Sequence, residues 1–138
     1  MDDFNLQRFV DAQQPVYETV RAELSAGRKR SHWIWYIFPQ IEGLGFSAMA
    51  ERYAISGLAE ARAYLAHPLL GARLRECCAL VLASDSASAH AIFGSPDDMK
   101  LRSSLTLFAQ AAPEETLFAD CLQKYYGGQP DPATLDRL

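Results

Sequence analysis

The residues best suited to chemistry lie in one short stretch, residues 28–47, which reads RKRSHWIWYIFPQIEGLGFS. Lys29 and Arg30 supply positive charge for a phosphate or a carboxylate. Trp33 and Trp35 supply flat faces on which a base or another ring can stack. A solvated basic turn followed by core tryptophans would have the same composition, but the combination favours a ligand site.

The same stretch holds the groups that would react with such a ligand or orient it. His32 can take or give a proton near neutral pH, although a structural histidine that bonds a carbonyl is an equal alternative. Gln40 ends the aromatic run with an amide that both donates and accepts. Gly43 and Gly45 let backbone amides approach an anion. The third glycine of a dinucleotide fingerprint is missing, so that interpretation is not adopted.

Four residues elsewhere could join this stretch. Gln13 falls on an apolar helical stripe, either as a core glutamine that ties down a kink or as a ligand contact. Arg73 lies in the first turn of a predicted helix, where it binds an anion or pairs with Glu76 or another surface acid. Lys100 and Ser104 are one turn apart on a mostly apolar helix and line a pocket or form its only solvated stripe.

Other catalytic and metal motifs are missing from the sequence. His32, His67 and His90 are isolated, with no HxxxH or HExxH spacing. There is no GxSxG elbow and no P-loop. We therefore expect neither a bound metal nor a cofactor.

Composition narrows the class of protein. The 138 residues fit one domain, residues 1–138, and the 49% hydrophobic content can form its core. A net charge of -4 disfavours nucleic acid as a partner. The sequence has no membrane-length apolar run, and we expect no signal peptide, because the start MDDFNLQRF lacks a basic and an apolar region. We interpret Cys77, Cys78 and Cys121 as reduced packing residues, which indicates the cytoplasm.

Helical periodicity dominates the rest of the chain. Pro15 should kink or divide the first helix, and Ser95 and Pro96 should cap and open another. Leu70, Leu74 and Val81 should face inward. The spacing predicts helices over residues 5–25, 47–53, 56–65, 69–83, 88–93, 95–111 and 114–126.

The aromatic segment at residues 33–38 departs from this periodicity. Both of its alternating faces are apolar, so it should be buried on all sides. No second run resembles a strand partner, so we expect an extended or irregular piece, or a short helix, rather than a sheet. The expected fold is mainly α, a compact single domain with an irregular aromatic segment (residues 31–46) packed into it.

Long motifs resemble a bacterial family known as domain of unknown function 1810. They are LQRFVDAQ, GRKRSHWIWYIFPQIEGLGFS, YAISGLAEARAYLAHPLLGARLREC and IFGSPDDMKLRSSLTLF. The resemblance implies a compact, mainly helical domain and no particular mechanism. Members sometimes carry the label calpastatin, which this aromatic-rich, repeat-free chain contradicts, because calpastatin-like inhibitors are disordered and repetitive. A weaker similarity links the chain to helical N-glycosidase domains acting on ADP-ribose-like or flavin-precursor substrates.

Two functions follow as hypotheses. The first is binding or turnover of a small anionic, ring-bearing molecule such as a nucleotide or an ADP-ribose-like compound. In it Lys29, Arg30 and Arg73 hold the anion, His32 acts as acid or base, and Lys100 is the second candidate catalytic residue. The second is a non-catalytic protein-interaction domain, in which the tryptophans belong to the core or to a partner surface.

Overall fold

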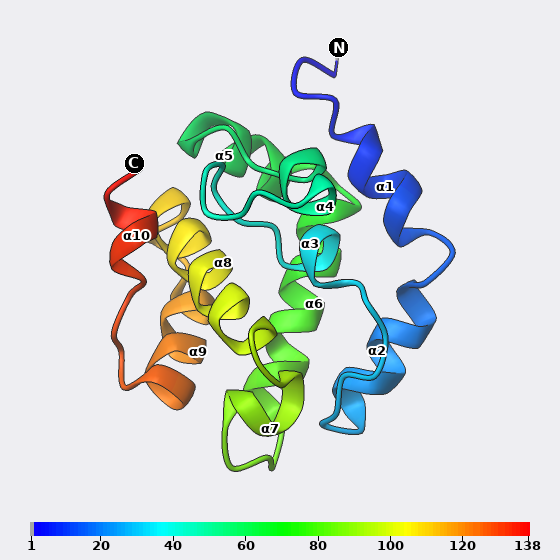
Figure 1. Ribbon diagram of the computed structural model, residues 1–138, viewed down its shortest axis with the longest axis vertical. Coiled ribbons are helices and arrows are strands. Elements are labelled where there is room, and N and C mark those ends of the chain that lie inside the picture. Colours follow the sequence, from blue (N-terminus) through cyan, green and yellow to red (C-terminus); the bar gives the residue numbers. More distant parts are fainter. Residues whose placement is uncertain (1) are drawn as a thin grey trace.

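Residues 2–138 are described by the structure, a computed structural model (Figure 1). Within this range the chain forms ten helices and no strand, with one isolated parallel bridge between Ile41 and Ile55. The predicted mainly helical fold is therefore confirmed. None of the helices within this range is both long and apolar enough to cross a membrane. In chain order they are α1 (Gln7–Gln13), α2 (Tyr17–Ser25), α3 (Ile34–Ile37), α4 (Ala48–Arg52), α5 (Leu58–Ala66), α6 (Leu70–Ala83), α7 (Ala89–Phe93), α8 (Asp97–Ala111), α9 (Thr116–Tyr126) and α10 (Pro132–Leu135).

Helix α8 lies at the centre and contacts α3, α5, α7, α9 and α10 (Figure 1). Leu101, Leu105, Leu107 and Phe108 on this helix are buried, and the ring of Phe108 contacts the neighbouring helices. The ring centroid of Phe108 lies 5.4 Å from that of Tyr64 on α5 and 5.9 Å from that of Phe118 on α9. Side chains on α8 that point away from this core are therefore held on a rigid support.

Helix α6 packs against α2, α5 and α9. Leu70, Leu74 and Val81 are buried, as the periodicity predicted. Cys77 and Cys78 share this buried face, and Cys121 of α9 meets them as a third free thiol. Burial raises the pKa of Cys77 to about 12, so this thiol stays protonated at neutral pH.

Pro15 divides the first helical segment, as predicted. Helix α1 ends at Gln13, and α2 begins at Tyr17. Proline has no backbone donor and crowds the preceding turn, so the helix breaks there. The break places the Gln13 amide inside the core, beside α3.

The aromatic segment forms the one-turn helix α3, one of the two forms expected for it. Trp33, Ile34, Tyr36, Ile37 and Phe38 are buried, whereas Trp35 is only partly buried. The indole of Trp35 is thus the part of α3 that is open to a ligand.

The start of α8 differs from the prediction. The predicted cap at Ser95 is wrong, because the helix begins at Asp97 and Pro96 occupies the position before it. The carbonyl of Gly94 accepts the N–H of Asp98 and turns the chain into the helix without a serine cap. Asp97 and Asp98 still lie in the first turn, where negative charge favours the helix.

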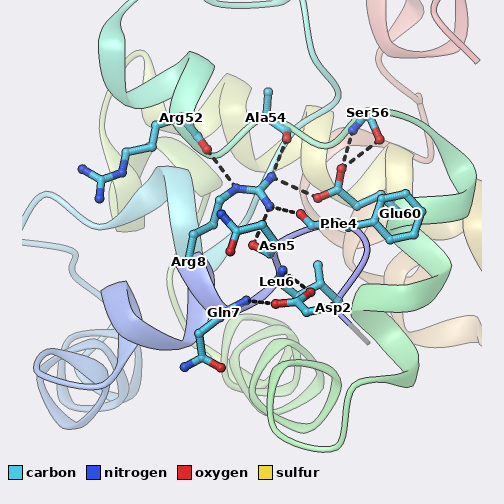
Figure 2. A network of polar contacts seen from close by, with 10 residues as sticks. All are labelled: Asp2, Phe4, Asn5, Leu6, Gln7, Arg8, Arg52, Ala54, Ser56 and Glu60. Atoms are coloured by element: carbon cyan, nitrogen blue, oxygen red, sulfur yellow. Dashed lines mark hydrogen bonds and ion pairs between the residues drawn. The ribbon is translucent and has the colours of Figure 1, made fainter.

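A largely buried ion pair joins α1 to α5, and hydrogen bonds from the same arginine reach the end of α4 and the segment after it (Figure 2). The guanidinium of Arg8 lies 3.0 Å from the carboxylate of Glu60, and it also donates to the carbonyls of Arg52 and Ala54 at 2.9 Å. Glu60 in turn accepts from the backbone N–H and the hydroxyl of Ser56 at 2.9 Å. This network fixes the chain that follows α4.

Candidate functional site

Two adjoining cavities, of about 170 and 390 Å³, lie beside the segment that links α3 to α4. The first is also lined by Glu42, Gly43 and Glu51, and the second by Lys100 and Asp131. Both are lined by the same five residues, which therefore form the boundary between them: Trp35, Gln40, Leu44, Gly45 and Ala50. The candidate site is this pair of cavities.

The linking segment has a defined backbone path. The N–H of Ile55 donates to the carbonyl of Gln40 at 2.8 Å, and the N–H of Glu42 donates to the carbonyl of Ile55 at 2.9 Å. Gly43 then takes a φ of +90°, a conformation that L-residues with a side chain rarely adopt. The hydroxyl of Ser47 caps α4 by accepting the N–H of Ala50 at 3.1 Å, as predicted.

Lys100 reaches the site from the first turns of α8. Its ammonium lies 4.8 Å from the centroid of the Trp35 ring, within cation–π range. It also lies 3.5 Å from Asp97, whose other oxygen is 2.7 Å from the ammonium of Lys29. Asp97 thus forms ion pairs with two lysines, and the shorter of the two is with Lys29.

Several hydrogen-bonding groups at the site are not used by the protein. The side-chain amide of Gln40 has no hydrogen-bond partner among residues 2–138. Within the same range, the backbone N–H groups of Gly43, Gly45 and Phe46 also have no acceptor. A bound molecule can therefore use these donors without breaking a contact of the fold.

Acidic groups occupy defined places around the cavities. Glu42 and Glu51 line the smaller cavity and are exposed. Asp131 lines the larger one and accepts the hydroxyls of Ser103 at 2.7 Å and Thr134 at 2.6 Å. Burial opposes ionisation of Asp131, but these hydrogen bonds hold its pKa below the usual value, so it carries a negative charge.

The structure places Gln13 and Arg73 outside both cavities. The amide nitrogen of Gln13 donates to the carbonyl of Tyr36 at 2.7 Å and to the hydroxyl of Tyr64 at 3.0 Å. Arg73 donates to the side-chain oxygens of Gln13 and Gln14 and lies over the ring of Tyr17. These two predicted site residues contact each other and not the Trp35 cavities.

The basic end of residues 28–47 also lies apart from the cavities. Arg30 and His32 are exposed, and neither lines them. Lys29 is almost fully buried against Asp97 and lies 5.0 Å from the ring of Trp33. Lys29 therefore reaches the site only indirectly, through the carboxylate that it shares with Lys100.

Glu23 explains why this end of the stretch is ordered. Its carboxylate accepts the N–H groups of Arg30 and Ser31, the hydroxyl of Ser31 and the indole N–H of Trp33. Burial works against the charge, but these four hydrogen bonds outweigh it and lower the pKa of Glu23 to about 2. Trp33, only 1% exposed, belongs to the core.

Ser104 also lies outside the set that lines the cavities. It is 1% exposed, and its hydroxyl is the one buried side-chain oxygen without a hydrogen-bond partner in residues 2–138. Its neighbour Ser103 lines the larger cavity instead.

The sequence analysis missed several residues of the site. Phe46 and Met99 are large apolar residues with 84% and 49% of their surface exposed, and both line the larger cavity. Nothing in their local pattern distinguishes them from core residues. The sequence does mark Asp131, because an acid before Pro132 is typical of a helix start. That pattern predicts a helix cap and does not predict a cavity.

Comparisons with known proteins agree with this fold over nearly the whole chain. The family model described as "Protein of unknown function (DUF1810)" matches residues 3–138. The chain is 55% identical to the conserved hypothetical protein Rv1873 from Mycobacterium tuberculosis, whose crystal structure it matches with a TM-score of 0.98. That match covers 99% of this chain and 98% of the other. No curated protein matches the chain.

Proposed function

The chain belongs to the DUF1810 family of proteins of unknown function, and we propose that its paired cavities bind a small, anionic, ring-bearing molecule of the nucleotide or ADP-ribose type. One observation carries the proposal. Four residues expected from the sequence to bind a ligand, Trp35, Gln40, Gly43 and Gly45, and the catalytic candidate Lys100 each line at least one of the two adjoining cavities.

The ion pairing of Lys100 supports an anionic ligand, and the carboxylate of Asp131 is the one negative charge among residues 2–138 that also lines the larger cavity. Lys29 and Lys100 carry two positive charges and share the single carboxylate of Asp97, so the three side chains together keep one positive charge. Lys29 has the shorter contact with Asp97, so Lys100 is the cation that is more available to a ligand. Unpaired N–H groups in the adjoining glycine segment add donors for a phosphate or a carboxylate.

The apolar side chains around the larger cavity favour a ligand that contains an aromatic ring. One part of the Trp35 indole is covered by the ammonium of Lys100, which limits stacking there. The exposed side chains of Phe46 and Met99 offer further apolar surface at the same cavity. A planar base fits such a lining, because aromatic and thioether side chains pack favourably against the face of an aromatic ring.

The lining of the smaller cavity favours a sugar as a second part of the same ligand. Glu42 and Glu51 can accept hydrogen bonds from hydroxyl groups, as a ribose would offer. The two carboxylates repel a phosphate, so the anion belongs at the edge of this cavity, where Gly45 joins it to the cavity that Lys100 lines. A molecule with a base, a ribose and a phosphate combines all three features.

In this proposal Lys100 has a binding role and His32 has none. Lys100 acts through its charge, and His32 lies outside both cavities. The proposal concerns binding and contains no N-glycoside cleavage step.

A thermal-shift series with ADP-ribose, AMP and adenosine tests the proposal. Free ligand at a hundred times its Kd stabilises a protein by about 2.7 kcal/mol, which should raise the Tm by about 5–10 °C. Lys100→Ala should weaken binding of the phosphate-bearing ligands by about 10–100-fold, the worth of a hydrogen bond to a charged group.

Arg28→Ala is the matched control, because it removes an exposed cation that lines neither cavity. It should respond to every ligand as the wild type does. If none of the three compounds raises the Tm at millimolar concentration, the proposal is wrong. An unchanged response of Lys100→Ala would remove Lys100 from the site.

A second candidate function is a non-catalytic protein-interaction domain. It is favoured by the exposure of Phe46 and Met99 at one cavity, since such side chains often mark a partner surface. It predicts no Tm response to any of the three compounds, so the same series separates the two candidates.

A further inference from the structure

We propose that Arg137 is a second anion-binding residue of the site and acts on the phosphate groups of the ligand. The inference rests on the proposed function and adds a residue that the sequence patterns did not indicate. Three observations carry it: the place of the guanidinium, its lack of a partner, and the anchoring of the helix that precedes it.

The guanidinium of Arg137 lies against Gly43. A Cβ atom added to Gly43 would come within 2.1 Å of Nη1 and 2.5 Å of Cζ of Arg137, closer than any real contact. Gly43 therefore leaves the space that this guanidinium occupies. Gly43 also lines the smaller cavity; Arg137 itself lines neither cavity, so its charge lies next to a lining residue of the site.

This charge is not neutralised by the fold. Arg137 is exposed, and its guanidinium forms no hydrogen bond and no ion pair with any residue from 2 to 138. Arg8 and Arg75, by contrast, each pair with a glutamate. An arginine fork with free donors beside unpaired backbone N–H groups is the chemistry that recognises phosphate.

Hydrogen bonds anchor to α8 the start of α10, the helix whose end carries the backbone of Arg137. Asp131 accepts the hydroxyl of Ser103, and its backbone N–H donates to the hydroxyl of Thr106 at 2.8 Å. Arg102 donates to the carbonyls of Gln129 and Pro130, both at 2.9 Å. Helix α8 therefore carries Lys100 directly and holds Arg137 through α10, so that the two cations approach the Gly43–Gly45 segment from the same rigid support.

Two cations on one segment suit a pyrophosphate better than a single phosphate. Lys100 lines the cavity that Gly45 shares, and Arg137 contacts Gly43. The ligand class that follows is a nucleoside diphosphate derivative such as ADP-ribose, with AMP bound more weakly.

Isothermal titration calorimetry with ADP-ribose and adenosine tests the inference on the full chain. Arg137→Ala should weaken ADP-ribose binding by about tenfold or more and leave adenosine binding unchanged, because only the first ligand carries phosphate. Arg137→Lys should recover part of the loss, since it keeps the charge but not the fork. Arg28→Ala should match the wild type.

The outcomes separate this inference from the proposed function. If wild type binds ADP-ribose and Lys100→Ala weakens that binding while Arg137→Ala does not, the role of Arg137 is refuted and the site stands. If Arg137→Ala weakens adenosine binding equally, Arg137 supports the fold of the segment and does not bind phosphate. If wild type binds neither compound at millimolar concentration, both proposals fall.

Discussion

Arg8→Ala should lower the free energy of unfolding by about 3–5 kcal/mol, because it leaves the nearly buried carboxylate of Glu60 without its ion-pair partner. The side chain of Glu60 is 4% exposed, so water cannot replace the guanidinium. The carbonyls of Arg52 and Ala54 lose their donor in the same step (Figure 2). Urea denaturation of wild type and variant measures the loss.

Arg21→Ala is the control for this variant. Arg21 also pairs with glutamates, but its side chain is 44% exposed, and exposed ion pairs contribute little to stability. Its unfolding midpoint should therefore hardly move. A loss below about 1 kcal/mol for Arg8→Ala would show that the network does not hold the chain after α4.

The Arg8→Ala substitution should also affect ligand binding at the candidate site. Tyr53 and Ala54 line the smaller cavity, and Arg8 holds the carbonyl of Ala54. We therefore expect weaker ligand binding in Arg8→Ala even at temperatures where it is fully folded. Combining it with Glu60→Gln should cost less than the sum of the two single losses, because both act on one interaction.

Asp97→Ala should also lower the free energy of unfolding by about 3–5 kcal/mol. It removes the ion-pair partner of Lys29, whose side chain is only 5% exposed. The remaining contacts of that ammonium, the carbonyl of Ser31 and the ring of Trp33, do not balance a full charge. Thermal unfolding at neutral pH measures the change.

Asp98→Ala separates this effect from the loss of a charge at the start of α8. It removes a carboxylate from the same first turn, but the histidine that it contacts is 67% exposed. Asp98→Ala should lower the free energy of unfolding by about 1 kcal/mol, as expected for the loss of a helix-dipole interaction and an exposed ion pair. Equal losses in the two variants would mean that Lys29 does not depend on Asp97.

Local patterns in the sequence predicted most of the helices. Leu70, Leu74 and Val81 repeat at helical spacing and are buried, because periodicity alone decides which face of a long helix meets the core. Pro15 broke its helix for a reason contained in one residue. The aromatic segment carries no periodicity, so only packing against α1 and α8 decides between a short helix and an irregular form.

Apart from Lys100 on α8, the predicted residues that line the candidate cavities come from one segment. Trp35, Gln40, Gly43 and Gly45 are close in sequence, so their joint position follows from the path of a single segment. Lys29 was expected beside them, but its charge is taken by Asp97, a partner that lies far along the chain. Such long-range pairing also occupies Gln13 and Trp33, and no local pattern reveals it.

Exposed residues escaped prediction for a related reason. Phe46 reads in the sequence as one more core aromatic, yet it is 84% exposed and lies just before Ser47, the cap of α4. Arg137 reads as a solvated arginine, and only the fold brings it to Gly43. The positions of both side chains follow only from the packing of the helices.

The most direct test of the ligand site is an NMR titration of ¹⁵N-labelled protein with ADP-ribose. The chain has two tryptophans, so its spectrum holds one indole signal from the site and one from the core. We predict that the Trp35 indole and the N–H signals of Gly43, Gly45 and Phe46 shift. The Trp33 indole, bonded to Glu23, should stay in place. Absence of any shift at millimolar ligand, or shifts centred elsewhere with Trp35 unmoved, would contradict the account.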